Sequence, residues 1–329
     1  MRYIIHGAGS VGAVIGARLF EQGAEVVLIA RGDHLRAIQR SGLAVQSPVG
    51  FVTLQVPAVA HPSEIAFRGG EDVVLLATKT QDSAQALDDL RHVAGAEVPV
   101  VCLQNGVEGA RIAVRRFERV AGAITMLPSV YLRAGIVQAF SAPAAGIVDV
   151  GRYPCGDSAV VAAVAADLRR AGFHSEVRSD ILRWQYGKLL DNLKNVLQAL
   201  CGPTADYHDL VTELRAEAET CYRAAGIAYA SESELRSRSK GVLNLGTIDG
   251  LTRPGDSSWQ SLARATGSIE TDFLNGEIAM LGRVHGVPTS LNARLQELAN
   301  QHARERRSPG SLRIDDLHQL LRRRHESSL

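Results

Sequence analysis

The 329-residue sequence has few of the cysteines that form disulfides in small secreted proteins, and its cysteines and histidines lack the spacing of metal sites. Its four cysteines, at positions 102, 155, 201 and 221, lie far apart and lack the short spacings of metal sites. The ten histidines are scattered in the same way. We therefore predict no metal site, and we expect unpaired thiols in a reducing cytoplasm.

An excess of charge and a long apolar run are also lacking. The formal net charge is +1, so the composition gives no indication of a nucleic-acid-binding surface. No apolar run is long enough to cross a bilayer, and glycines interrupt the short apolar stretch after Arg2, which argues against a signal peptide. With 46% hydrophobic residues, the chain is typical of a soluble cytoplasmic enzyme that is large enough for two domains.

What the chain does contain is a glycine-rich loop near its start. Residues 2–6 are expected to form a strand, and the loop Gly7-Ala8-Gly9-Ser10-Val11-Gly12 then opens a helix. This is the G-x-G-x-x-G pattern of a dinucleotide-binding βαβ unit, in which the glycines permit a tight turn, the approach of a pyrophosphate and close helix packing. The N–H groups of the loop and of the helix N-terminus are expected to face the phosphate. The alternative is a glycine-rich turn that binds nothing.

The residue that ends the second expected strand indicates which dinucleotide is bound. NAD sites usually carry Asp or Glu there, whereas this strand ends at Arg31. A carboxylate would repel a ribose 2′-phosphate, and an arginine can form a forked pair with it, so Arg31 favours NADP(H). Asp33 is a competing NAD signal, but we expect it to cap a helix that begins near His34.

The rest of the chain divides into an alternating half and a helical half. Strands or extended segments are expected at 42–59, 72–78, 98–103, 123–131 and 135–150, with helices at 81–91 and 159–171. This alternation predicts a mainly parallel sheet covered on both faces, as in a Rossmann-type α/β domain. Later segments show only helical periodicity, at 180–200, 210–225, 257–285 and 290–307. We predict an NADP-binding domain at 1–178 and an all-α substrate, catalytic and dimerisation domain at 179–329.

Two polar residues directly follow buried strands of the first half. Lys79 follows the strand at 72–78, and Asn105 follows the strand at 98–103. Since ligands of such sheets bind beyond the carboxyl ends of the strands, both side chains are expected to project toward the cofactor. A surface lysine and a turn asparagine before Gly106 are the alternatives.

A polar stripe on the expected helix at 180–200 supplies the main catalytic candidate. At about 100° per residue, Gln185, Asn192 and Asn195 lie at about +60°, +40° and −20° relative to Lys188. A lysine flanked by amides on a mostly apolar helix would border a cleft, where partial desolvation would lower its pKa and make it a usable proton donor. The alternative is an ordinary solvated helix face.

Two further charged segments are less distinctive. The expected helix at 257–285 contains Glu270, Asp272 and Glu277, for which a surface carboxylate is the default. Near the end, Arg322-Arg323-Arg324 is expected to be a solvated helix end rather than an anion-binding tail.

Taken together, these pieces resemble the ketopantoate reductases (2-dehydropantoate 2-reductases). The similarity extends from Gly7 to about Glu297. It rests on the glycine loop, Arg31, Ala77-Thr78-Lys79-Thr80-Gln81, Gln104-Asn105-Gly106, Lys188 with Asn192, Ser257-Ser258, and Glu270-Thr271-Asp272-Phe273-Leu274-Asn275-Gly276.

The resemblance implies NADPH-dependent reduction of a 2-keto acid to a 2-hydroxy acid, with ketopantoate and pantoate as the expected pair. It implies that Lys188 donates the proton and stabilises charge on the carbonyl oxygen, and that Asn105 touches the nicotinamide side and orients the lysine. Asn192 and Ser258 fall where the family binds substrate. Glu270 falls where it bonds the cofactor ribose or the distal hydroxyl of the substrate.

The chain also departs from the family pattern near the expected substrate pocket. Val196 stands where the family usually has a second asparagine, although Asn195 precedes it. Gly255 and Ser261 occupy two other positions where the family tends to carry asparagine and an acid, respectively. These changes leave open a paralogue that reduces a different keto acid. A non-catalytic NADP(H)-binding regulatory protein is a third hypothesis.

The helical half carries two further structural expectations. On one straight helix Ser258 and Glu270 would lie about 18 Å apart, too far to share a small substrate, so a break near Gly267 or a later helix start is expected. The large amphipathic surfaces of the helical half are compatible with a homodimer.

Overall fold

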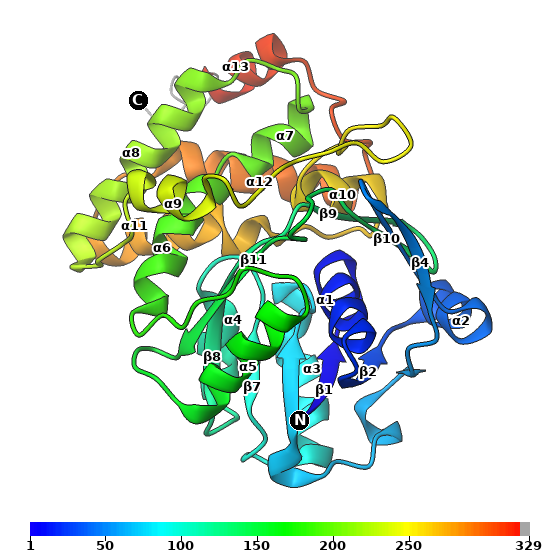
Figure 1. Ribbon diagram of the computed structural model, residues 1–329. Coiled ribbons are helices and arrows are strands. Elements are labelled where there is room, and N and C mark those ends of the chain that lie inside the picture. Colours follow the sequence, from blue (N-terminus) through cyan, green and yellow to red (C-terminus); the bar gives the residue numbers. More distant parts are fainter. Residues whose placement is uncertain (323–329) are drawn as a thin grey trace. The chain divides into compact units, whose positions relative to one another are not determined.

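The computed structural model describes residues 1–322, and the chain divides into two compact units (Figure 1). Unit 1 comprises Met1–Gly187 and Tyr229–Arg253, and unit 2 comprises Lys188–Ala228 and the chain from Pro254 onward. The boundary expected after residue 178 lies near the first of these divisions. The return of the segment at 229–253 to unit 1 was not expected from the sequence.

Unit 1 is built on a seven-stranded sheet whose strand order is β11-β8-β7-β6-β1-β2-β5. Every neighbouring pair is parallel except β11 and β8, which confirms the mainly parallel sheet. The strands are β1 (Arg2–His6), β2 (Glu25–Ile29), β5 (Ala58–Val59), β6 (Asp72–Leu76), β7 (Val100–Cys102), β8 (Val120–Met126) and β11 (Ile147–Arg152).

Helices cover both faces of this sheet, as the Rossmann-type pattern predicts. α1 (Ser10–Glu21) and α5 (Ala159–Arg170) pack on one face, where Tyr3 and Ile5 of β1 enter the same apolar cluster (Figure 1). α3 (Ser83–Ala94) and α4 (Glu108–Val114) pack on the other face, in the cluster that contains Ile4. Because both faces are covered, the central strands are continuous apolar runs rather than alternating ones.

A separate four-stranded sheet of unit 1 has the order β4-β3-β10-β9 and packs on α1. Its strands are β3 (Leu43–Ser47), β4 (Gly50–Leu54), β9 (Ser129–Arg133) and β10 (Ile136–Ala139), and α2 (Gly32–Ser41) precedes it. The strands expected at 123–131 and 135–150 are each divided between the two sheets. Pro128 and Pro143 stand in the divisions, where a residue without an N–H cannot continue a ladder.

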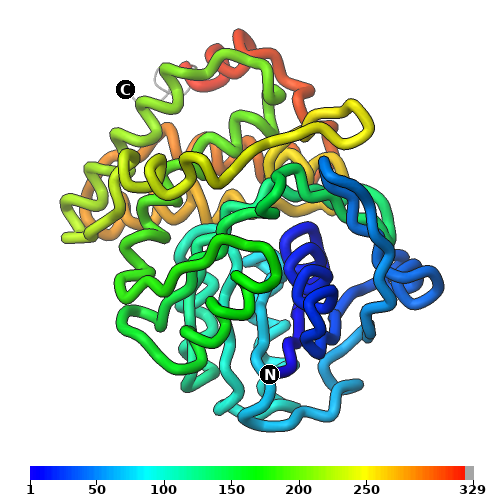
Figure 2. The backbone as a smooth tube through the Cα atoms, viewed as in Figure 1, coloured from blue at the N-terminus to red at the C-terminus, as the bar shows by residue number. Residues whose placement is uncertain are grey.

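Ion pairs, one of them buried, hold the segment at 229–253, yellow in Figure 2, to the rest of unit 1. Its helix α9 (Glu232–Ser239) carries Arg238, which donates to both carboxylate oxygens of Asp149 on β11 at 2.8 and 2.7 Å. The Asp149 side chain is 0% exposed, so the pair is shielded from water. Glu234 of the same helix accepts two hydrogen bonds from Arg183, at 2.9 and 2.7 Å.

Within its described residues unit 2 is helical, which confirms the all-α assignment of the C-terminal half. α6 (Ile181–Asn192) runs from unit 1 into unit 2. The other elements are α7 (Asn195–Cys201), α8 (His208–Ala225), α10 (Ser257–Ala263), the 3₁₀ helix η4 (Glu270–Phe273), α11 (Asn275–His285), α12 (Ser290–Arg304) and α13 (Ile314–Arg322). No helix in residues 1–322 has both the length and the hydrophobicity to span a bilayer.

The expected continuous helix at 180–200 is wrong, because α6 ends at Asn192 and α7 begins at Asn195. In an unbroken helix the Leu193 carbonyl would accept the N–H of Leu197. Here it accepts the side-chain amide of buried Asn275 at 3.2 Å, and Leu197 N–H bonds to the Lys194 carbonyl instead. The sequence-based angle of Asn195 about the helix therefore does not apply.

The expected helix at 257–285 is broken as well. Ala265 and Gly267 adopt left-handed backbone conformations, with φ of 49° and +81°, between α10 and η4. The break expected near Gly267 is thus confirmed, and the straight-helix distance between Ser258 and Glu270 does not apply. Because η4 and α11 are also separate elements, Glu270 and Glu277 do not share one helix face.

Asp33 and Arg322 lie at the ends of helices. Asp33 does not cap α2, since the helix begins at Gly32 after Arg31 and Asp33 lies in its first turn, paired with Arg36. The run Arg322-Arg323-Arg324 was expected to be a solvated helix end. Arg322 is the last residue of α13, and Arg323 and Arg324 lie outside the described residues.

Removing the charge of Asp149 tests how strongly α9 is held. Asp149→Asn would leave Arg238 buried beside a neutral amide, with only Glu176 3.6 Å away, so the free energy of unfolding should fall by about 3 kcal/mol. Urea denaturation measures this change. Asp157→Asn, at an exposed site, is the matched control and should change stability by less than about 0.5 kcal/mol. Equal stabilities of the two variants would contradict a structural role for the buried pair.

Candidate functional site

The predicted cofactor residues of unit 1 follow neighbouring strands of the parallel sheet. The glycine loop follows β1, Arg31 follows β2, Lys79 follows β6 and Asn105 follows β7, and these strands are adjacent in the order β7-β6-β1-β2. Parallel strands end at the same edge, so the sheet brings these groups together. α1 and α3 leave toward opposite faces on either side of β1, which is the topological switch point where such sheets bind ligands.

The three glycines of the loop have different structural requirements. A Cβ on Gly7, whose φ is +106°, would lie 2.6 Å from the backbone nitrogen of Thr78, and a Cβ on Gly12 would lie 2.2 Å from the Gly7 carbonyl oxygen. The fold itself therefore needs both glycines. A Cβ on Gly9 would meet nothing within 4 Å. The open space at Gly9 fits the approach of a pyrophosphate, which is the role of this glycine in a dinucleotide loop.

Not all N–H groups of the loop are available to an anion. Those of Gly7 and Ala8 both donate to the carbonyl of Ile29, at 3.2 and 3.0 Å, so the expectation that the whole loop faces the phosphate is wrong. The first N–H groups of α1 have no acceptors within the helix. No side chain caps α1, whose N-cap residue is Gly9, and its first turn contains no acid. This helix N-terminus is therefore the part of the loop suited to hold a phosphate.

Arg31 is exposed and lies two residues after the end of β2, as the N-cap residue of α2. None of the ion pairs formed among residues 1–322 includes it. Its guanidinium is thus an uncompensated positive charge at the edge of the sheet that carries the glycine loop. Such a charge suits a phosphate monoester, which accepts a forked pair of hydrogen bonds.

Lys79 and Asn105 follow strand ends that are joined by a hydrogen-bond network. The hydroxyl of Ser83 bonds to the Lys79 carbonyl at 3.1 Å and to the hydroxyl of Thr78 at 3.1 Å. The side-chain amide of Gln104 donates to the Ser83 hydroxyl at 3.0 Å. Ser83 and Gln104 were not predicted as site residues, although Gln104 directly precedes Asn105. The hydrogen bond between Ser83 and Gln104 joins two strand ends that are distant in sequence, so a local pattern could not predict it.

The remaining predicted residues belong to unit 2. Lys188 is half-buried in α6, Asn192 ends that helix, and Asn195 begins α7 and is buried. α7 packs against α10, where Asp256 accepts hydrogen bonds from the N–H groups of Ser258 and Trp259 at 2.9 and 3.0 Å. In turn, the Asp256 N–H donates to Gln198 of α7 at 2.9 Å. The N-terminus of α10, with Ser258, is therefore fixed against α7.

Glu270 and Glu277 are both buried, at 5% exposure, so the default of a surface carboxylate is wrong for them. Asp272 is exposed and accepts hydrogen bonds from Gln296 and Asn300 of α12, which gives it a structural role. Asn275, the first residue of α11, also donates to Asn292 at 3.1 Å, so two buried amides connect the start of α11 to α12. The role of Glu270 as a site residue stays a prediction from the sequence.

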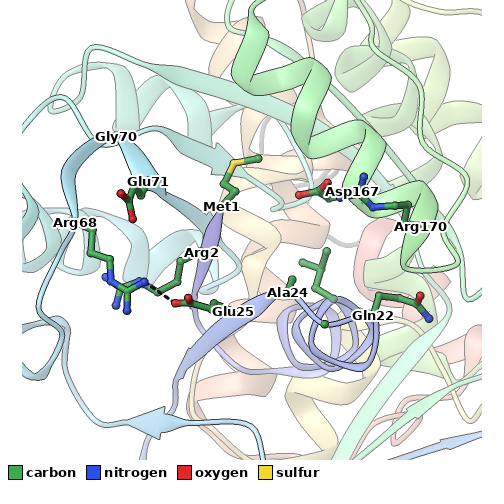
Figure 3. A pocket seen from close by; sticks show the side chains of 12 residues that line it. Met1, Arg2, Gln22, Ala24, Glu25, Arg68, Gly70, Glu71, Asp167 and Arg170 are labelled. Atoms are coloured by element: carbon green, nitrogen blue, oxygen red, sulfur yellow. Dashed lines mark hydrogen bonds and ion pairs between the residues drawn. The ribbon is translucent and has the colours of Figure 1, made fainter.

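The cavity drawn in Figure 3 does not coincide with these residues. It has a volume of ≈ 650 Å³ and lies at the amino ends of the strands, beside Arg2, Glu25 and Glu71. The glycine loop lies at the carboxyl ends. The arginines of the cavity pair with carboxylates: Arg68 with Glu25 at 2.6 Å, Arg2 with Asp72 at 2.7 Å, and Arg170 with Asp167 at 2.5 Å. None of the three arginines that line this cavity is therefore an uncompensated charge.

Within residues 1–322 no group of three or more His, Cys, Asp or Glu side chains is arranged to hold a metal ion. The four cysteines are unpaired.

The fold and the strand-end residues define a class: a Rossmann-type α/β unit with a dinucleotide loop, joined to a helical unit. Comparison with known families is more specific. The family model for ketopantoate reductase PanE/ApbA matches residues 3–154, and the model for its C-terminal part matches residues 180–303. This chain belongs to the ketopantoate reductase PanE/ApbA family.

Individual relatives agree with this assignment. The chain is 27% identical to a 2-dehydropantoate 2-reductase of Pyrococcus horikoshii, over 89% of this chain and 94% of the relative. It is 29% identical to a 2-dehydropantoate 2-reductase of Mesorhizobium japonicum, over 88% and 94%, respectively. These relatives are oxidoreductases that act on CH–OH groups.

Solved structures show the same fold. A PanE/ApbA family ketopantoate reductase from Ralstonia eutropha JMP134 has a TM-score of 0.76 and 26% identity, covering 93% of this chain and 99% of that one. A ternary structure of D-mandelate dehydrogenase with NADH and anilino(oxo)acetate has a TM-score of 0.78 and 23% identity, with the same coverage. The second similarity shows the fold alone.

Two alanine substitutions should separate the ligand-binding glycine from a structural one. Gly9→Ala adds a methyl group in open space, so the free energy of unfolding should change by less than about 0.5 kcal/mol. Dinucleotide affinity should fall at least about tenfold, or about 1.4 kcal/mol, because the methyl group blocks the pyrophosphate. Calorimetric titration with NADPH and NADH, together with urea denaturation, measures both effects.

Gly12→Ala is the comparison variant. Its methyl group would overlap the backbone oxygen of Gly7, so it should lower stability as well as binding. Wild-type affinity in Gly9→Ala would show that the loop does not contact a dinucleotide.

Proposed function

We propose that this protein catalyses the NADPH-dependent reduction of 2-dehydropantoate (ketopantoate) to pantoate. The observation that carries the proposal is the assembly of the glycine loop, Arg31, Lys79 and Asn105 at one edge of the parallel sheet, in a chain that belongs to the ketopantoate reductase family. The relatives named as 2-dehydropantoate 2-reductases support the choice of substrate.

The preference for NADPH over NADH rests on the end of β2. Arg31 is exposed there and forms no ion pair with any residue in 1–322, so it suits the 2′-phosphate of NADP. The competing NAD signal is weaker, because Asp33 lies in the first turn of α2 and is paired with Arg36. The N-terminus of α1, with the open space at Gly9, would hold the pyrophosphate. When bound, reduced NADP supplies the hydride that reaches the ketone carbon.

The proton and the charge stabilisation come from the protein in this proposal. The ammonium of Lys188 donates a proton to the carbonyl oxygen and stabilises the negative charge that develops there. Asn105 orients this amine and the nicotinamide side of the site. Asn192, Asn195 and Ser258 bind the keto acid. The proposal requires the Lys188 amine to reach the carbonyl oxygen during the reaction.

Glu270 has a proposed binding role. A buried carboxylate accepts hydrogen bonds from hydroxyl groups, so Glu270 would bond the cofactor ribose or the distal hydroxyl of the substrate.

A different 2-keto acid is the second candidate substrate, and two observations favour it. Val196 is buried, at 1% exposure, in α7. Gly255 is covered by Trp259, since a Cβ there would lie 2.4 Å from the indole ring. Both positions lie in segments expected to border the substrate, and neither offers a polar side chain. A non-catalytic NADP(H)-binding protein is the third hypothesis. The cytoplasmic location and the homodimer stay predictions from the sequence.

A panel of keto acids tests the proposed reaction. Ketopantoate should give a kcat/KM at least about tenfold above those of pyruvate, 2-ketoisovalerate and phenylglyoxylate, and NADPH should exceed NADH by a similar factor, each about 1.4 kcal/mol in transition-state binding. Absorbance of the reduced cofactor at steady state gives these values. A higher kcat/KM with another acid would favour the paralogue, and turnover with none would favour the non-catalytic protein.

Removal of the proposed proton donor is the second test. Lys188→Ala should lower kcat by about 10²- to 10⁴-fold, the usual contribution of a positioned general acid, with NADPH affinity nearly unchanged. Lys194→Ala, at an exposed lysine near the start of α7, is the matched control and should retain full turnover. Full turnover in Lys188→Ala would exclude the proposed role of its amine.

A further inference from the structure

A buried histidine directly precedes the glycine loop. His6 is the last residue of β1 and pairs with Ile29 of β2 and Leu76 of β6. It is 2% exposed, and its Nδ1 atom is buried without a hydrogen-bond partner among the described residues. An unpartnered polar atom in the interior costs free energy, and such atoms are rare in native proteins.

Positive charge near His6 exceeds negative charge. Arg31 at the end of β2, His61 beyond β5 and Asp89 of α3 are the groups whose charges act on it. His61 Nε2 lies 3.5 Å from a carboxylate oxygen of Asp89, so this acid already has a partner. Arg31 has none among residues 1–322. The end of β1 thus has a positive environment without a fully matching anion.

This environment keeps the imidazole of His6 neutral. Burial and the charge of Arg31 lower the pKa of His6 to about 4, so at pH 7 the ring carries one N–H donor and one lone pair. A phosphate dianion bound beside Arg31 would oppose the repulsion from that guanidinium. It would also offer acceptor oxygens to the ring. The binding of a dianion should therefore favour the protonated ring, with uptake of a proton.

We infer that His6 is a specificity-determining residue for the nucleotide, and that its ring donates a hydrogen bond to the adenosine 2′-phosphate which Arg31 also binds. The inference rests on the proposed preference for NADPH. His6 directly precedes the loop that would hold the pyrophosphate, and it pairs with Ile29, two residues before Arg31. It acts on binding only and takes no part in hydride or proton transfer to the keto acid.

Two nucleotides that differ only in the 2′-phosphate test this role without turnover. Calorimetric titration of the full chain with 2′,5′-ADP and with 5′-AMP, at pH 7 in buffers of different ionisation enthalpy, gives both the affinities and the number of protons taken up. The wild type should bind 2′,5′-ADP at least about tenfold more tightly than 5′-AMP, and should take up protons only with 2′,5′-ADP.

Substitutions of His6 should change these two quantities separately. His6→Leu should reduce the preference for 2′,5′-ADP about tenfold, while its affinity for 5′-AMP stays within about twofold of wild type. His6→Asn keeps a neutral donor near the Nδ1 position, so it should retain part of the preference and lose the proton uptake. If His6→Leu does not fold, the loss of proton uptake in His6→Asn decides the question.

Arg31→Ala separates this inference from the proposed function. A wild-type protein that binds both nucleotides equally would overturn both the NADPH preference and the role of His6. If Arg31→Ala loses the preference while His6→Leu keeps it, the NADPH preference stands and the role of His6 is overturned. Unchanged proton uptake in His6→Asn would overturn it as well, since a histidine that only fills the core would not be the group that titrates.

Discussion

The pairing of β1 with its two neighbours is the constraint on which the candidate nucleotide site depends. β1 pairs with β2 and with β6 in parallel, and both ladders end at His6. The chain must leave the sheet there, and the left-handed conformation of Gly7 and the tight contact at Gly12 direct it into α1. Because the neighbouring strands end at the same level, Arg31 and Lys79 follow at the same edge. A shift of one strand would separate these groups.

Local features of this arrangement could be predicted from the sequence. The spacing of Gly7, Gly9 and Gly12 after an apolar strand predicts the turn, since each glycine meets a steric requirement within the same few residues. Continuous apolar runs predict buried parallel strands. In each case the physical cause lies within one strand, turn or helix.

Features with long-range causes could not be predicted in this way. The break between α6 and α7 depends on Asn275, which takes the Leu193 carbonyl from a distant part of the chain. The periodicity of residues 180–200 cannot reveal such a competitor. Likewise, Glu270 lies outside the helix that contains Ser258, and the role of Ser83 follows from bonds to two strand ends. Helical patterns show which faces are apolar but not where a buried amide interrupts the backbone.

The ion pair between α9 and β11 affects when unit 1 can finish folding during translation. Unit 1 is discontinuous, so its first stretch emerges from the ribosome well before Arg238, the buried counter-ion of Asp149. Until then, the carboxylate on the edge strand must remain hydrated or rely on Arg178. N-terminal domains usually fold first as they are made, but this one cannot reach its final state until part of unit 2 has also been translated. A fragment that ends at the apparent end of the α/β half would lack this partner permanently.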